Sequence, residues 1–254
     1  MQTDGTLSEP TASTPALNAD YPWDEFSSTD YCDHNYLELR QDDAEILRIS
    51  AAWFTEAMAG RTGRALDVGA GPNLYPSLAM LPHCTDLTLR EYSAANLDFL
   101  RRQTAKLPER WLPFWEIAAA QSGAGEFAEA RELLAERAVV EQGSIFELPQ
   151  AAWDLGAMFF VAESLSEDPA EFEAATACFV RALRPGAPFA AAFMEHSLGY
   201  DVAGVSFPAT PVGEPEIAAC LGPLAADLTV HWVEMRPQLR PGLNGMIVAV
   251  GRAR

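Results

Sequence analysis

Two glycines and an acid are spaced to bind a nucleoside in the segment between Asp67 and Glu91. The run Asp67-Val68-Gly69-Ala70-Gly71-Pro72-Asn73 follows a short apolar stretch, and glycines at such a turn let a ligand approach the backbone closely. A loop that cradles a pyrophosphate would carry a third glycine at position 74, where this chain has Leu74. The turn therefore predicts a nucleoside ligand without phosphates rather than a dinucleotide.

A carboxylate follows this turn at a distance typical of ribose binding. Glu91 lies twenty residues beyond Gly71 and ends the next apolar stretch, where an acid can accept hydrogen bonds from both ribose hydroxyls. Hydrogen bonds to a charged group contribute roughly 1.5–3 kcal/mol each. The glycine turn or the acid alone is weak evidence, but their spacing on consecutive strand–helix units predicts a nucleoside cofactor site.

Strands that alternate with helices must position these residues. Apolar stretches predict strands at 65–68, 87–91, 138–142, 154–162, 188–194, 228–235 and 246–251. Helical spacing of apolar residues covers 42–58, 170–183 and 214–221, and further helices are expected from 72 and from 94. This order predicts an α/β fold with a Rossmann-like, doubly wound, mostly parallel seven-stranded sheet and an antiparallel terminal hairpin.

The chain is expected to form one domain behind a short tail. Residues 1–20 are small, polar and rich in proline, so we expect a disordered tail there and a single domain over 21–254. Within that domain, 21–60 is expected to cover the site as an aromatic arm and a helix. The arm has no regular period, so it is either a lid on a ligand or a strap over the core. The segment 96–137 predicts a helical insertion of two helices.

Composition excludes several classes of protein. The formal net charge is −19, which repels phosphate backbones and anionic headgroups, so neither nucleic acid nor a membrane surface is an expected partner. We find no signal peptide and no apolar run of about 18 residues, so a cytoplasmic protein is expected. The four cysteines form no CxxC pair, which predicts reduced thiols and no metal site.

Two stretches carry a family resemblance. RALDVGAGPNLY at 64–75, followed by LTLREYSAANLDFL at 87–100, resembles the class I S-adenosylmethionine-dependent methyltransferases. Within them the chain is similar to the nicotinamide, phenylethanolamine and thioether/indolethylamine methyltransferase group, although Glu91 stands where that group usually has Asp. The likeness runs from about Trp23 to the end, and its specific part is 64–100. It implies S-adenosyl-L-methionine as cofactor and a small-molecule acceptor.

The resemblance also implies which residues hold the cofactor. Glu91 would bind the ribose, and the loop after the fourth strand, including Val161, would line the methyl-donor pocket. Two arm tyrosines would close over the sulfonium, a cation that an aromatic face stabilises by roughly 0.5–2 kcal/mol. The implied cofactor-binding residues are Tyr31, Tyr36, Asp67, Gly69, Gly71, Tyr75, Glu91, Tyr92, Asn96, Ser144, Ile145 and Val161.

Methyl transfer is an in-line displacement in which proximity supplies most of the acceleration. A neutral amine or pyridine nitrogen needs no base, whereas a phenol or an indole carbon benefits from one. The candidate catalytic groups are His34, Glu38, Glu163 and His196, and the candidate acceptor-binding groups are Glu195, His196, Tyr200 and Asp201. Met194 stands where the family often has an aspartate, so the family's own substrates are not carried over.

These residues favour an enzyme that methylates an amine or an aromatic nitrogen. Carbon or oxygen methylation of a specialised metabolite such as an indole is one alternative, and a non-catalytic nucleoside-binding protein is another. A nicotinamide-dependent dehydrogenase is disfavoured by Leu74 and the Pro72-Asn73 turn. The many Ala, Arg and Pro residues are typical of a high-GC bacterium, where such enzymes often act in secondary metabolism. The sequence does not distinguish a monomer from a homodimer.

Overall fold

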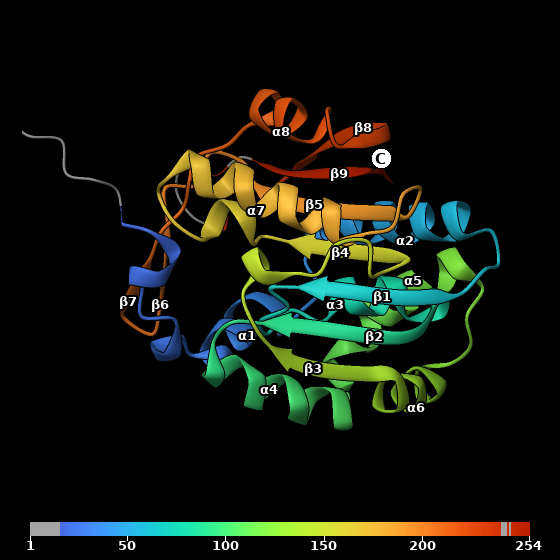
Figure 1. Cartoon of the computed structure of the whole chain (residues 1–254). Coiled ribbons are helices and arrows are strands. Elements are labelled where there is room, and N and C mark those ends of the chain that lie inside the picture. Colours follow the sequence, from blue (N-terminus) through green and yellow to red (C-terminus); the bar gives the residue numbers. More distant parts are fainter. Residues whose placement is uncertain (1–15, 240–242, 244) are drawn as a thin grey trace, which may run out of the picture.

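A seven-stranded sheet forms the centre of the protein (Figure 1). The computed structural model describes residues 16–239, 243 and 245–254. The strand order is β3-β2-β1-β4-β5-β9-β8, and β9 runs antiparallel to both β5 and β8 while the other pairs are parallel. The strands are β1 (Gly63–Val68), β2 (Cys84–Glu91), β3 (Ala138–Gln142), β4 (Leu155–Phe159), β5 (Pro188–Met194), β8 (Ala225–Glu234) and β9 (Gly245–Ala253). The predicted fold class is confirmed, including the antiparallel hairpin.

Helices cover both faces of this sheet. One core lies between the sheet and the helices α2 (Gln41–Met58), α3 (Tyr75–Met80), α4 (Ala94–Ala105), α5 (Leu112–Ser122) and α6 (Phe127–Arg137). A second core lies against α7 (Pro169–Ala182) and α8 (Glu214–Leu221) on the other face. Neighbouring residues of one strand serve opposite faces: Ala65 packs in the first core and Leu66 in the second. Strands buried on both faces are why the central stretches read as continuous apolar runs.

The insertion after β2 differs from the prediction. Residues 94–137 hold three helices rather than the two expected within 96–137, because Pro113 in the first turn of α5 favours a new helix start and Gly123 ends that helix at φ +72°. Strand β4 also ends at Phe159, short of the predicted 162, because Phe160 takes φ +61°. That reversal turns the chain from the sheet toward the site.

The N-terminal segment is more regular than expected. Residues 1–15 of the predicted tail lie outside the described residues, but Asn18–Asp20 form a 3-10 turn, and the buried Asn18 donates its backbone N–H to Glu171 at 2.7 Å. The prediction of disorder is therefore wrong for 18–20, since this contact with α7 orders them. The arm continues through a second turn, Trp23–Glu25, into α1 (Ser28–Tyr36), a helix that the aromatic pattern did not predict.

A small hairpin supports the arm. Strands β6 (Tyr200–Val202) and β7 (Val205–Phe207), also not predicted, pair with each other outside the main sheet. Trp23 stacks on Phe207 with ring centroids 5.2 Å apart, and Phe26 meets the same ring edge-on at 5.3 Å. The arm is thus a strap held by a segment that follows β5.

Two further features bear on the expectations. All four cysteines are unpaired. In the described part of the chain, no helix combines the length and the apolar character that crossing a membrane requires.

Candidate active site

The turn after β1 uses its own backbone donors. Gly69 and Gly71 take φ +64° and +50°, a region that favours glycine, and a Cβ at Gly69 would come within 2.6 Å of Val161. The N–H of Gly69 donates to Arg90 O at 2.7 Å, and the N–H of Asn73 donates to Ala70 O. The N–H of Gly71 donates to Glu91, and Pro72 has no N–H. Few backbone N–H groups of this turn therefore remain free to bind a diphosphate.

Glu91 is buried at the carboxyl end of β2 and faces a pocket. Its Oε2 accepts the N–H of Gly71 and its Oε1 accepts the N–H of Ser93, each at 2.8 Å. Burial raises the pKa of this carboxyl, and the two backbone donors oppose that rise. Each carboxylate oxygen accepts more than one hydrogen bond, so Glu91 can still bind two hydroxyl donors.

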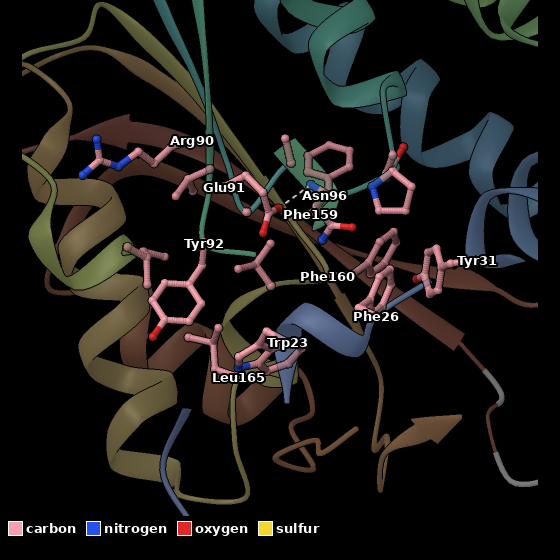
Figure 2. A pocket seen from close by; sticks show the side chains of 18 of the residues that line it. Trp23, Phe26, Tyr31, Arg90, Glu91, Tyr92, Asn96, Phe159, Phe160 and Leu165 are labelled. Atoms are coloured by element: carbon pink, nitrogen blue, oxygen red, sulfur yellow. Dashed lines mark hydrogen bonds between the residues drawn. The ribbon is translucent and has the colours of Figure 1, made fainter. Parts of the chain in front are cut away.

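A pocket of about 850 Å³, open mouth included, lies over these carboxyl ends. Figure 2 shows Glu91 and Asn96 on one side of it and Trp23, Phe26 and Tyr31 on another, while the Arg90 side chain turns away from its centre. The lining residues are Asn18, Trp23, Phe26, Tyr31, Tyr36, Val68, Gly69, Ala70, Gly71, Pro72, Asn73, Arg90, Glu91, Tyr92, Asn96, Gly143, Ser144, Ile145, Phe159, Phe160, Val161, Leu165 and Tyr200.

Two polar contacts fasten the arm beside Glu91. Asp24 accepts the backbone N–H of Ala94 at 2.9 Å, which satisfies one of the free donors at the start of α4. Ser28 donates its hydroxyl to Asn96 Oδ1 at 2.5 Å, in a buried position. The aromatic strap is therefore positioned by the same turn that carries the acid.

Most residues that the resemblance assigned to the cofactor line this pocket. They are Tyr31, Tyr36, Gly69, Gly71, Glu91, Tyr92, Asn96, Ser144, Ile145 and Val161. Asp67 and Tyr75 do not. Asp67 lies beneath the turn, where it accepts the Ser77 hydroxyl at 2.6 Å and burial raises its pKa to about 7. Tyr75 is fully buried and stacks on Phe114 at 5.9 Å, so it supports the site from behind.

A second pocket of about 510 Å³, mouth included, adjoins the first. The two share four aromatic residues, Tyr31, Tyr36, Phe160 and Tyr200. Tyr31 packs edge-on against Tyr36 at 6.1 Å and against Tyr200 at 6.2 Å, so these rings form a wall common to both pockets. The remaining lining residues are Asn35, Arg40, Asp43, Ser164, Met194, Ser197, Leu239 and Met246.

The predicted catalytic groups line neither pocket. His34 and Glu38 are exposed, and the exposed ring of His196 packs over Gly213 at the start of α8. Glu163 is fully buried and accepts the N–H of Met194 at 2.9 Å, which links the ends of β4 and β5. Burial raises the pKa of Glu163 to about 8, so this side chain holds a proton at neutral pH.

Of the predicted acceptor-binding groups, only Tyr200 lines a pocket. Glu195 accepts the indole N–H of Trp232 at 2.9 Å and is thereby held at the β8 side of the sheet. Asp201 is exposed on β6 and accepts the Ser206 hydroxyl at 2.5 Å. A loop prediction from residue types could not tell which side chains of this segment turn inward.

Several pocket residues escaped the sequence prediction. Trp23, Phe26, Phe160 and Leu165 line the first pocket, and Asn73 does so from within the motif itself. Asn73 Oδ1 accepts the N–H of Tyr75 at 3.1 Å, while its buried Nδ2 has no hydrogen-bond partner among the described residues. The position of Asn73 inside the glycine turn could have marked it as a site residue, because an amide donor that is buried in such a turn needs a hydrogen-bond partner.

These residues fit S-adenosylmethionine. Glu91 offers acceptors for two ribose hydroxyls, the free Asn73 Nδ2 suits a carboxylate, and Tyr31 and Tyr36 offer faces to a sulfonium. The engaged backbone donors of the turn suit a ligand without a diphosphate.

The fold and this pocket define a Rossmann-like, S-adenosylmethionine-dependent methyltransferase that acts on small molecules. Residues 15–243 match the model of the NNMT/PNMT/TEMT family, and the chain belongs to that family. No curated protein matches the chain.

Solved structures are similar to this chain at low sequence identity. The glycopeptide N-methyltransferase MtfA, complexed with S-adenosyl-L-homocysteine, is 12% identical with a TM-score of 0.52, over 80% of this chain and 88% of that one. The cyclase SpnF is 14% identical with a TM-score of 0.51, over 84% and 81%. The 1,6-didemethyltoxoflavin-N1-methyltransferase of Burkholderia thailandensis is 20% identical with a TM-score of 0.48, over 84% and 80%.

Proposed function

We propose that this enzyme methylates a nitrogen, either an amine or an aromatic ring nitrogen, of a small acceptor. The observation that carries this choice is the position of the predicted bases. His34, Glu38 and His196 lie on the surface outside both pockets, and buried Glu163 is engaged by Met194. A neutral nitrogen nucleophile has a free lone pair and needs no base, whereas a phenol or an indole carbon benefits from one. The carboxyl that does line the second pocket, Asp43, is taken here as a group that binds the acceptor and not as a base.

The first pocket would hold the cofactor, which supplies an activated methyl group on a sulfonium. Glu91 would fix the ribose through charge-assisted hydrogen bonds. Ser144 and Ile145, which line the pocket beyond β3, would flank the adenine, and Tyr92 and Asn96 would lie near the adenosine. Placing these contacts at the ends of two neighbouring strands, β2 and β3, would give the rigid alignment that an in-line displacement requires.

The second pocket would hold the acceptor. Its wall of Tyr31, Tyr36 and Tyr200 adjoins the cofactor pocket, so an acceptor lying against it would present its nitrogen toward the donor. Burial raises the pKa of Tyr36 well above its ordinary 10, so the phenol stays neutral and the pocket keeps its aromatic character. The strap and the β6–β7 hairpin would exclude water from this junction.

The test is methyl transfer from isotopically labelled S-adenosylmethionine to a panel of small amines, pyridines, phenols and indoles. We expect products only from nitrogen acceptors, with the methyl group on nitrogen by NMR. Products methylated only on oxygen or carbon would overturn the proposal. Tight S-adenosylhomocysteine binding by calorimetry, without turnover of any acceptor, would favour a binding role instead.

A further inference from the structure

A buried carboxyl at the wall of the second pocket has no role in the site described so far. Asp43, in the first turn of α2, is 3% exposed and lines this pocket beside Asn35 and Arg40. Its neighbour Asp42 is equally buried but does not line the pocket. Two adjacent acids of one helix therefore have different surroundings.

The nearby positive charge, that of Arg40, forms an ion pair with Asp42. Arg40 donates from Nε and Nη2 to the two carboxylate oxygens of Asp42, at 3.0 and 2.6 Å. The same Nη2 also donates to the carbonyl of Pro237 at 2.7 Å. Within residues 16–239, 243 and 245–254, no cation forms an ion pair with Asp43. The carboxyl at the pocket wall is thus not neutralised by the arginine three residues before it.

In the absence of a ligand, the surroundings of Asp43 disfavour the charged form of its carboxyl group. Burial and the adjacent Asp42 raise its pKa to about 7, and the Tyr75 hydroxyl and Arg40 oppose the rise only in part. A buried carboxylate becomes favourable when a cationic or N–H donor reaches it. The pocket it faces is lined by the rings of Tyr31, Tyr36 and Phe160. Aromatic faces beside a carboxylate suit an organic ammonium group.

We propose that Asp43 binds a basic amine group of the acceptor and selects such acceptors over neutral molecules of the same shape. The amine is held as an ammonium, which has no lone pair, so the nitrogen that takes the methyl group is a second, neutral nitrogen of the acceptor. The proposal rests on the proposed function, in that it takes the second pocket as the acceptor site. A carboxylate can accept from an ammonium or amine N–H, whereas a hydroxyl in the same place offers a weaker, uncharged donor. A site built to bind a charged donor discriminates against an analogue that lacks it.

The experiment compares two ligands that differ in one group, benzylamine and benzyl alcohol. Their binding to the full chain saturated with S-adenosylhomocysteine is measured by calorimetry and saturation-transfer NMR. The wild type should bind benzylamine at least tenfold more tightly than benzyl alcohol. Asp43→Asn should lose at least tenfold in benzylamine affinity and change alcohol affinity less than twofold. Glu45→Gln, which removes an exposed charge from the same helix, should behave as the wild type.

Three results separate the possibilities. Equal affinity of the wild type for the two ligands overturns the proposal without any variant, so it stays testable if Asp43→Asn does not fold. Unchanged benzylamine affinity in a folded Asp43→Asn, shown by normal S-adenosylhomocysteine binding, also overturns it. If benzylamine binding depends on Asp43 but no nitrogen acceptor of the panel is methylated, the proposed function fails and the anchor role of Asp43 stands.

Discussion

The Glu91 carboxylate accepts the backbone N–H of Gly71 at 2.8 Å, and this bond ties the end of β2 to the turn after β1. The acid predicted to bind a ribose therefore also fixes the loop that would contact the rest of the cofactor. Its second oxygen accepts Ser93 N–H at the start of α4, where Asp24 and Ser28 fasten the arm. One side chain thus connects three parts of the site.

Replacing Glu91 by alanine should weaken cofactor binding. Hydrogen bonds to a charged group contribute roughly 1.5–3 kcal/mol, so the dissociation constant for S-adenosylhomocysteine should rise at least tenfold. Isothermal calorimetry measures it. Asp98→Ala, which removes an exposed acid of α4, serves as the matched control and should bind normally. An unchanged constant for Glu91→Ala would remove this residue from the site.

A methyl group at Gly69 should disrupt both the fold and the site. Gly69→Ala forces a side chain to φ +64° and places its Cβ within 2.6 Å of Val161. Gly60→Ala isolates the first effect, because Gly60 has φ +78° with nothing within 4 Å of an added Cβ. Backbone strain costs about 1–3 kcal/mol in either variant. Urea unfolding should show a larger loss for Gly69→Ala, and calorimetry should show loss of binding only there; equal losses would contradict this account.

Asn73→Asp should distinguish the role of the Asn73 side-chain oxygen from that of its nitrogen. The variant keeps the oxygen that accepts Tyr75 N–H but replaces the unpartnered Nδ2 with a second oxygen. If Nδ2 binds the cofactor carboxylate, the dissociation constant for S-adenosylhomocysteine should rise at least tenfold, since a charge-assisted bond is replaced by repulsion. The new carboxylate is buried without a partner, so the melting temperature of the free protein should also fall, and binding is measured well below it. Normal binding would mean that Nδ2 meets no ligand.

Glu163→Gln should change the pH dependence of stability and leave catalysis nearly intact. The folded wild type keeps a proton on Glu163 up to about pH 8, whereas the unfolded chain loses it near pH 4.3. The unfolded state therefore binds fewer protons between these values, and wild-type stability falls as pH rises, by up to about 1.4 kcal/mol per pH unit.

The neutral glutamine can still accept Met194 N–H, and the variant lacks this fall. Urea unfolding at pH 5, 6, 7 and 8 should show Glu163→Gln gaining on the wild type as pH rises, while its kcat/KM stays within about threefold. Asp43 and Asp67 also have raised pKa values, but both proteins share them, so the difference isolates Glu163. A loss of activity of a hundredfold would instead indicate a general base.

The two candidate histidines should be dispensable for chemistry. His34 and His196 are exposed and line neither pocket, so His34→Ala and His196→Ala should retain kcat/KM within about threefold at every pH tested. General-base catalysis typically accelerates a reaction 10²–10⁴-fold, so replacing a true general base should lower kcat/KM by at least about a hundredfold. A loss of that size in either variant, with normal S-adenosylhomocysteine binding, would revive the base-dependent alternative.

The parallel sheet and the glycine turn after β1 could be predicted because their signals are local. Strands buried on both faces favour continuous apolar runs, and a strand–turn–helix with φ above zero favours glycine, so the segment 64–75 can be recognised directly in the sequence. The third helix of 94–137 was partly readable from Pro113 and Gly123, which separate one helix from the next. Helix α1 was not, because its aromatic residues pack on several neighbours and follow no single helical face.

By itself, the sequence determined the Rossmann-like fold and placed a glycine turn and an acid, Glu91, at the spacing from which we predict nucleoside binding. Only the tertiary structure decided which acids and rings meet in the second pocket. Asp42 and Asp43 are identical in type and adjacent in the chain. Arg40 forms an ion pair with Asp42, whereas Asp43 lines the second pocket. His196 and Tyr200 lie in one loop, yet only Tyr200 turns inward. Side-chain direction in such segments depends on packing between distant elements, and residue type alone does not encode it.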